Sequence, residues 1–253
     1  MATLEDTLTA KRTPLYHLHQ ANQPDATGWQ HLCGYAIKAT LDEALFEPTT
    51  GAPACGLTDL SALARGGLRG KKAATILSEY HYQVPAAPNQ ALRQEDGSLV
   101  AKLSASEYLL LGSLADSGLD NSSFADDGER ISRDELAWQA AERAHRLPDA
   151  YLLPRQDTHA WLALTGAHVS DVMAKLCGVD LSPEAFAPGH VAQTSVARAN
   201  AIIINASQAD LSCLYLLVDS ASACYLWPIL LDAMQEFEGK ELSIIALRHH
   251  HPA

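Results

Sequence analysis

Residues 54–80 read ACGLTDLSALARGGLRGKKAATILSEY, and this stretch is the best organised part of the chain. Three glycines punctuate a short extended piece in its middle: Gly66, Gly67 and Gly70. From Lys71 onward, apolar residues recur with the spacing of one helical face, at Ala73, Ile76, Leu77 and Tyr80. The stretch therefore predicts a strand, a tight turn and an amphipathic helix.

Further runs with the periodicity of strands and helices follow along the chain. The expected strands are 107–111, 161–164, 195–205 and 211–218, and the expected helices are 133–147, 169–176 and 221–238. Ser220 or Ser222 is the expected N-cap of the last helix. Pro228 lies inside that helix and predicts a kink or an irregular first turn, because proline costs ~3 kcal/mol in a helix interior. Strands and helices do not alternate strictly, so the pattern predicts an α+β fold with antiparallel sheets.

The acidic stretch 113–132 has few apolar residues, which favours a connecting loop. We expect the chain to divide there. The expected parts are a loose N-terminus over 1–12, an N-terminal lobe over 13–112, the loop over 113–132, a C-terminal lobe over 133–245 and a tail over 246–253.

The composition narrows the classes of partner. The chain has 253 residues, of which 47% are hydrophobic, and its formal net charge is -12. Such a charge repels phosphate backbones and anionic lipids, which argues against binding to nucleic acid or a membrane surface. The chain opens without the basic and apolar regions of a secretory signal, and no stretch reaches the length of a spanning helix, so we expect a cytoplasmic protein.

Five cysteines, an odd number with no Cys-x-x-Cys pair, stand at positions 33, 55, 177, 213 and 224. Neither a disulfide framework nor a tetrathiolate zinc site is indicated. We expect reduced thiols that are mostly buried.

Two clusters of polar residues are candidate binding sites. The glycines of 65–72 stand beside four basic residues before a helix, but they match no nucleotide-binding pattern, so a tight turn with a solvated basic rim is favoured over a phosphate site. Docking of this rim on an acidic partner is the weaker alternative. His17 and His19 would share one side of a strand with His31 as a third metal ligand, yet scattered polar histidines are the favoured interpretation.

Several passages resemble a known family. Residues 13–19, TPLYHLH, resemble the opening of glycine-cleavage T-proteins and their relatives. Residues 55–61, CGLTDLS, followed by Gly70 and the helix from Lys71, are similar to another passage of these proteins. The second half resembles the gamma subunit of heterotetrameric sarcosine oxidase in residues 164–166, 169–181, 188–189, 192–194, 220–227 and 236–237. The match spans most of 13–240 in the same order.

The resemblance implies a two-lobed folate-binding-type α+β fold, with antiparallel sheets and packed helices. It also implies a non-catalytic place in an amine-demethylating complex whose flavin-bearing subunits do the chemistry. The residues it marks for a folate cleft are Asp59, Arg198, Asn200 and Trp227, although the aromatics of 225–227 are expected first of all to pack in the core or at a subunit seam.

The sequence departs from the family at two places. Relatives carry an aspartate soon after the turn that corresponds to 96–99, whereas Val100, Ala101 and Lys102 follow here. The stretch whose glutamate contacts the pterin is replaced by 198–204, which keeps only the arginine. We therefore expect no cofactor on this chain, or tetrahydrofolate held weakly. The alternatives are a stand-alone folate-dependent aminomethyl or methyl transferase and an inactive module that retains the folate cleft.

Overall fold

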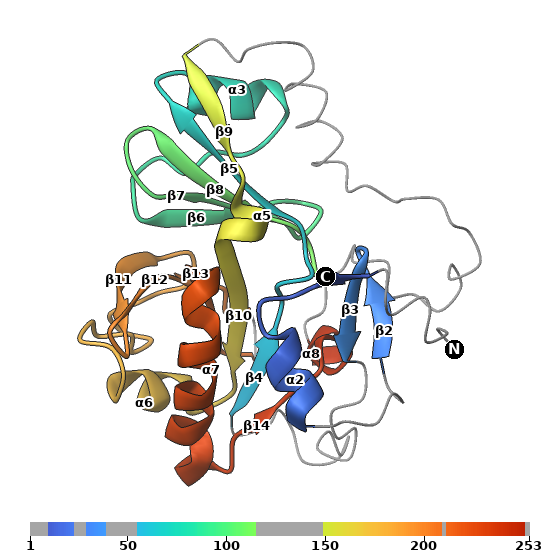
Figure 1. Ribbon diagram of the computed structural model, residues 1–253. Coiled ribbons are helices and arrows are strands. Elements are labelled where there is room, and N and C mark those ends of the chain that lie inside the picture. Colours follow the sequence, from blue (N-terminus) through green and yellow to red (C-terminus); the bar gives the residue numbers. More distant parts are fainter. Residues whose placement is uncertain (1–9, 23–28, 39–54, 115–148, 209–210, 251–253) are drawn as a thin grey trace. The chain divides into compact units, whose positions relative to one another are not determined.

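The computed structural model describes residues 10–22, 29–38, 55–114, 149–208 and 211–250 (Figure 1). These residues group into two compact units, one drawn from 1–62 and 159–252 and the other from 63–158. The grouping differs from the expected lobes because strand β4 (Gly56–Asp59) pairs with strand β10 (His159–Thr165), which joins early and late parts of the chain in one sheet. Residues 115–148, which hold most of the expected loop and all of the expected helix 133–147, lie outside the described residues.

The first unit is built on a six-stranded sheet. Its strands, in order across the sheet, are β11 (Val191–Val196), β12 (Ala199–Asn205), β13 (Cys213–Asp219), β10, β4 and β14 (Lys240–Glu241). All neighbours are antiparallel except β14 and β4, which run parallel. The antiparallel character and the mixture of helices and strands confirm the α+β prediction.

The expected strand 195–205 is wrong at its start. Ser195 belongs to β11, and the chain reverses at Ala197 and Arg198, whose φ angles are 46° and 70°. Two consecutive residues with positive φ form the tight turn that suits the twist of a two-residue hairpin. The turn contains no glycine and no Asn-Gly pair, so the sequence gives no signal that predicts it.

Two helices of the first unit pack beside the sheet. Helix α6 (Val169–Ala174) contacts helix α7 (Ser220–Met234), and α7 contacts β10 and β13 (Figure 1). The N-cap of α7 is Asp219, whose carboxylate accepts a hydrogen bond from the Ala221 amide at 2.9 Å, and not either serine. The helix runs through Pro228 and ends in a 3₁₀ turn, η2 (Gln235–Phe237). Its inner face buries Trp227 and Leu230 in the core of the unit.

A small sheet with flanking helices completes the first unit. The strands are β1 (Lys11–Arg12), β3 (Tyr35–Lys38) and β2 (Trp29–Leu32), and the helices are α2 (Tyr16–Asn22) and α8 (Ile244–His250). Residues 11–12 are therefore a strand, which corrects the expectation of a loose segment over 1–12 for these two residues. His17 and His19 lie on helix α2 and not on a strand.

In its described residues, the second unit is a five-stranded antiparallel sheet with two helices. Its strands are, in order, β6 (Gln90–Arg93), β7 (Leu99–Lys102), β8 (Glu107–Leu111), β5 (Arg65–Gly70) and β9 (Ala150–Leu153). Helices α3 (Ala73–Glu79) and α5 (Arg155–Thr158) contact β5. The predicted strand, turn and helix of 54–80 are confirmed.

The expected solvated basic rim of 65–72 is wrong for one residue. Arg65 is only 7% exposed, and its guanidinium donates to the backbone carbonyls of Leu63 and Gln156 at 3.0 and 2.8 Å. Lys71 and Lys72 are exposed, as expected. Arg65 is thus a structural residue of the second unit.

The five cysteines are free thiols, of which Cys55, Cys177 and Cys213 are buried and Cys33 and Cys224 exposed. Three of the five are therefore buried, which agrees with the prediction that most of the cysteines are buried. Among the described residues, no helix has the length and apolar character needed to cross a membrane.

Candidate functional site

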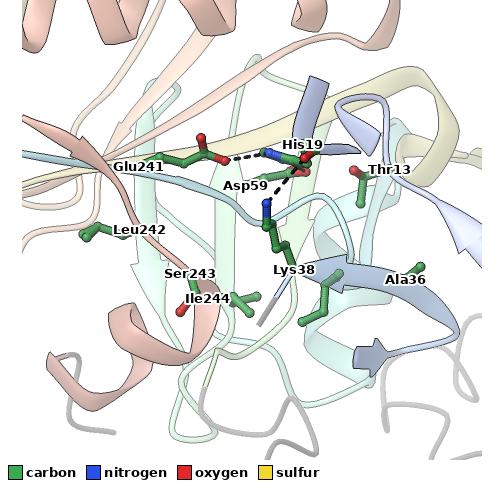
Figure 2. A pocket seen from close by; sticks show the side chains of 10 residues that line it. Thr13, His19, Ala36, Lys38, Asp59, Glu241, Leu242, Ser243 and Ile244 are labelled. Carbon is green, nitrogen blue, oxygen red and sulfur yellow. Dashed lines mark hydrogen bonds and ion pairs between the residues drawn. The ribbon is translucent and has the colours of Figure 1, made fainter. Parts of the chain in front are cut away.

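A small hollow in the first unit is lined by several charged side chains (Figure 2). The polar residues that line it are Thr13, His19, Lys38, Asp59, Glu241 and Ser243. Thr13 precedes α2, His19 lies on α2 and Lys38 ends β3. Asp59 ends β4, Glu241 lies on β14, and Ser243 follows β14. The hollow has room for about one water molecule.

His19 is the centre of this cluster. Its side chain is buried on α2, with Nδ1 2.7 Å from Glu241 Oε1 and Nε2 3.4 Å from Asp59 Oδ2. The close contact with Glu241 lies off the line of the N–H bond, so it is an ion pair without the alignment of a good hydrogen bond. One imidazole therefore bridges α2, β14 and β4.

The local fold explains why the two carboxylates meet His19. Asp59 ends β4, and its Oδ1 accepts a hydrogen bond from the Ser61 amide at 2.9 Å, which leaves Oδ2 directed at His19. Glu241 reaches the site because β14 pairs in parallel with β4, with Glu241 opposite Leu57. The sheet register thus sets the separation of the two acids.

Trp227 of α7 forms an apolar wall of the site. Its ring meets the His19 ring edge to face, with 5.2 Å between centroids and an angle of 90°. Trp227 is almost fully buried, so it excludes water from that side of the imidazole. Less water means less screening of the charges on His19 and its partners.

The pKa values reflect this environment. Burial lowers the pKa of His19, but contacts with Asp59 and Glu241 outweigh burial and raise that pKa to about 9. Burial would raise the pKa of Asp59, yet hydrogen bonding and charge from His19, with hydrogen bonds from Ser61, hold it below its usual range. At neutral pH the centre of the site is therefore an imidazolium between carboxylates.

Lys38 supplies a second cation at the edge of the hollow. Its side chain is 6% exposed, and its Nζ donates to the His19 carbonyl at a long 3.5 Å. Burial lowers the pKa of Lys38, and the charge of Glu241 opposes this. The cluster thus holds two cations and two anions, and both anions are paired with His19.

The polar groups at the centre of the site are engaged with one another. A protonated His19 has no free lone pair on its ring nitrogens, and both carboxylates face it. Among the residues that the structure describes, no group of three or more histidine, cysteine or acidic side chains is placed to hold a metal ion.

Of the four residues marked by the sequence, the structure brings two together. Asp59 and Trp227 both contact His19. Arg198 and Asn200 are exposed on the β11–β12 hairpin, and neither lines the hollow. The expected folate cleft formed by all four is not assembled around this hollow.

The sequence analysis missed His19, Glu241 and Lys38. His19 was expected to be one of several scattered polar histidines, but of the two histidines on α2 only His17 is exposed, and His19 is buried. The spacing of Leu15 and His19, four residues apart, was the available signal, because it puts both on one helical face. No sequence pattern marked Glu241, because a strand of two residues is too short to show the alternation of apolar and polar residues.

Two solved structures are similar to this chain in fold, although its sequence matches no known family. No family model matches the sequence, and no curated protein is similar to it in sequence. A chain of the heterotetrameric sarcosine oxidase from Corynebacterium sp. U-96, solved with pyrrole 2-carboxylate, aligns with a TM-score of 0.60 and 19% identity, over 92% of this chain and 98% of that one.

The second similar structure is the glycine cleavage system aminomethyltransferase T from Bartonella henselae. It aligns with a TM-score of 0.64 and 16% identity over 94% of this chain, which spans 60% of the aminomethyltransferase. The chain therefore has the fold that this sarcosine oxidase chain shares with aminomethyltransferase T, as the resemblance of its sequence to that family predicts.

Proposed function

We propose that this chain is a non-catalytic, gamma-type subunit of a sarcosine-oxidase-like amine-demethylating complex. In this role it supports the assembly of flavin-bearing subunits that carry out the one-carbon oxidation in the cytoplasm. The chain itself contributes a folded surface and no reacting group.

The observation that carries the proposal is the extent of the structural match. This chain corresponds to 98% of a chain from a heterotetrameric sarcosine oxidase, but to only 60% of aminomethyltransferase T. A chain that corresponds to a subunit over nearly its whole length is a better counterpart of that subunit than of a longer enzyme.

The chemistry of the described residues supports a non-catalytic role. The carboxylates of the hollow are engaged with His19, and the hollow is too small for a folate ring system. The Asp96 carboxylate accepts hydrogen bonds from the amide and hydroxyl of Ser98, at 2.9 and 2.6 Å. It therefore stabilises the turn in which it lies. Lys102, near the place where relatives carry an aspartate, donates to the Ala86 carbonyl at 3.0 Å.

The test is affinity purification of the tagged full-length chain from its native source. We expect it to bring down subunits with bound flavin, visible by absorbance, and with oxidase activity toward an N-methyl amino acid. The same chain expressed alone should show neither flavin nor turnover. A chain that purifies without a flavoprotein, or that demethylates an amine by itself with tetrahydrofolate, contradicts the proposal, and the second result would establish the stand-alone transferase.

A further inference from the structure

We propose that the hollow beside Lys38 is a carboxylate-binding site, in which Lys38 Nζ and Thr13 Oγ1 donate to one carboxylate group. The inference rests on the geometry of the hollow and does not depend on the assembly role. It assigns a ligand chemistry to a part of the cluster that the His19 ion pairs leave open.

Lys38 is the first reason. It is more than nine-tenths buried and lines the hollow, yet within the described residues its ammonium has one long hydrogen bond, to the His19 carbonyl, and no carboxylate at ion-pair distance. Figure 2 shows its Nζ directed toward His19, among the side chains that line the hollow. A buried ammonium without a close oxygen partner is unfavourable, because it has lost water and gained little in return.

Thr13 supplies a second donor. It is 7% exposed and lines the same hollow. Its backbone carbonyl accepts from the Tyr16 amide at 3.1 Å, while its hydroxyl has no hydrogen bond to any residue in the described part of the chain. A hydroxyl and an ammonium on one small hollow together suit an oxygen ligand with more than one lone pair.

The charges and the size select a carboxylate. Asp59 and Glu241 are both turned to His19, so neither neutralises Lys38 at close range. Coulomb energy falls with distance, so an oxygen in direct contact with Lys38 gains more from it than it loses to the more distant Glu241. The space of about one water admits one oxygen of a planar carboxylate with the rest at the mouth, whereas tetrahedral phosphate is bulkier.

The test uses formate as the probe and thermal unfolding of the full chain as the readout. Formate should raise the melting temperature by about 2–4 °C above the same concentration of sodium chloride, and the rise should saturate. Lys38→Met should abolish this difference, and Lys240→Met, at an exposed position, should keep it. Equal melting temperatures in formate and chloride for the unchanged protein would overturn the proposal, as would an undiminished formate effect in Lys38→Met.

Thr13→Val covers the case in which Lys38→Met does not fold. Valine keeps the shape of threonine and removes only the hydroxyl, so the formate concentration at half saturation should rise several-fold. An unchanged response to formate in Thr13→Val would contradict the assigned geometry.

The carboxylate could belong to a small molecule or to an acidic side chain of a partner. Purification of Lys38→Met from the native source separates the two. Loss of the flavoprotein together with the formate effect identifies a partner's carboxylate, and retention of the flavoprotein with loss of the formate effect identifies a free one.

Discussion

His19 Nδ1 lies 2.7 Å from Glu241 Oε1, and this contact ties α2 to β14 inside the first unit. Strand β14 has only two residues and pairs with β4 through Lys240 and Glu241. So short a strand contributes little hydrogen bonding of its own. The ion pair therefore adds to the backbone hydrogen bonds from Lys240 and Leu242 that hold β14 on the edge of the sheet.

Replacement of Glu241 by glutamine tests this role. Glu241→Gln keeps the shape and removes the charge beside a buried imidazolium, and we expect a loss of about 2–3 kcal/mol in the free energy of unfolding, since Asp59 still compensates part of the charge. Urea denaturation at pH 7 measures it. The control is Glu236→Gln, which removes an exposed ion pair with Lys175 and should cost at most about 1 kcal/mol. Equal losses of unfolding free energy in the two variants would show that the buried ion pair stabilises the protein no more than the exposed one.

The pH dependence of stability follows from the His19 pKa. The folded value of about 9 exceeds the unfolded value of 6.5, so the folded protein binds the proton more tightly. The stabilisation by the protonated His19 is complete below pH 6.5 and is lost as the pH rises through about 9. The difference in unfolding free energy between the natural protein and His19→Gln should therefore shrink over this range.

Asp59 acts in the opposite direction at low pH. Its pKa is held below the ordinary 3.8, so its contribution is present above that pH and is lost as the pH falls further. Urea denaturation of the natural protein and of His19→Gln, repeated between pH 2 and pH 10, would show the loss at low pH, the plateau and the alkaline loss. A difference that stays constant from pH 6 to pH 10 would contradict an imidazolium at this site.

The sequence predicted local elements well because their signals are local. The helix after Gly70 and the strand 107–111 were found from periodicity alone, and both are confirmed as α3 and β8. The hairpin turn at Ala197 and Arg198 was not predicted from the sequence. Alanine and arginine rarely adopt a positive φ, and here the contacts of the folded protein impose it. A contact from outside the sheet also fixes the turn: the hydroxyl of Tyr225, on helix α7, donates to the Ala197 carbonyl at 2.9 Å.

The site was harder to predict than the fold because it depends on contacts between distant segments. Asp59 was marked through family resemblance, and the structure gives it a partner in His19. His19 and Glu241 became recognisable only once the pairing of β14 with β4 placed them together. No local pattern encodes a contact across so many residues.

Gly70 ends β5 at the turn that leads into α3. Its φ is 150°, and a Cβ there would lie 2.1 Å from the Asp149 carbonyl oxygen, which is backbone and cannot easily yield. Gly70→Ala should destabilise the second unit by at least ~1–3 kcal/mol. Gly66→Ala is the matched control, because a Cβ at Gly66 meets no atom within 4 Å. Denaturation followed by circular dichroism compares the two, and similar stabilities would show that Gly70 is not required by the backbone.

The final prediction concerns tetrahydrofolate. The resemblance places a pterin in a central cleft of the relatives, where a carboxylate pairs with the N–H donors of the ring. Here Arg198 and Asn200 are exposed on a hairpin, and Asp59 is engaged with His19 and Ser61. Pterin donors buried without partners cost roughly 1–3 kcal/mol each, so two of them weaken binding by about one to four orders of magnitude.

We therefore expect the isolated chain to bind tetrahydrofolate weakly or not at all. Isothermal titration calorimetry on pure protein measures this, with a tetrahydrofolate-dependent enzyme in the same buffer as the positive control. Asp59→Asn distinguishes the residues involved, because it should leave the weak heat of binding unchanged if Asp59 serves only His19. A submicromolar dissociation constant for the unchanged chain, abolished by Asp59→Asn, would instead make Asp59 a folate ligand and would favour the transferase over the assembly subunit.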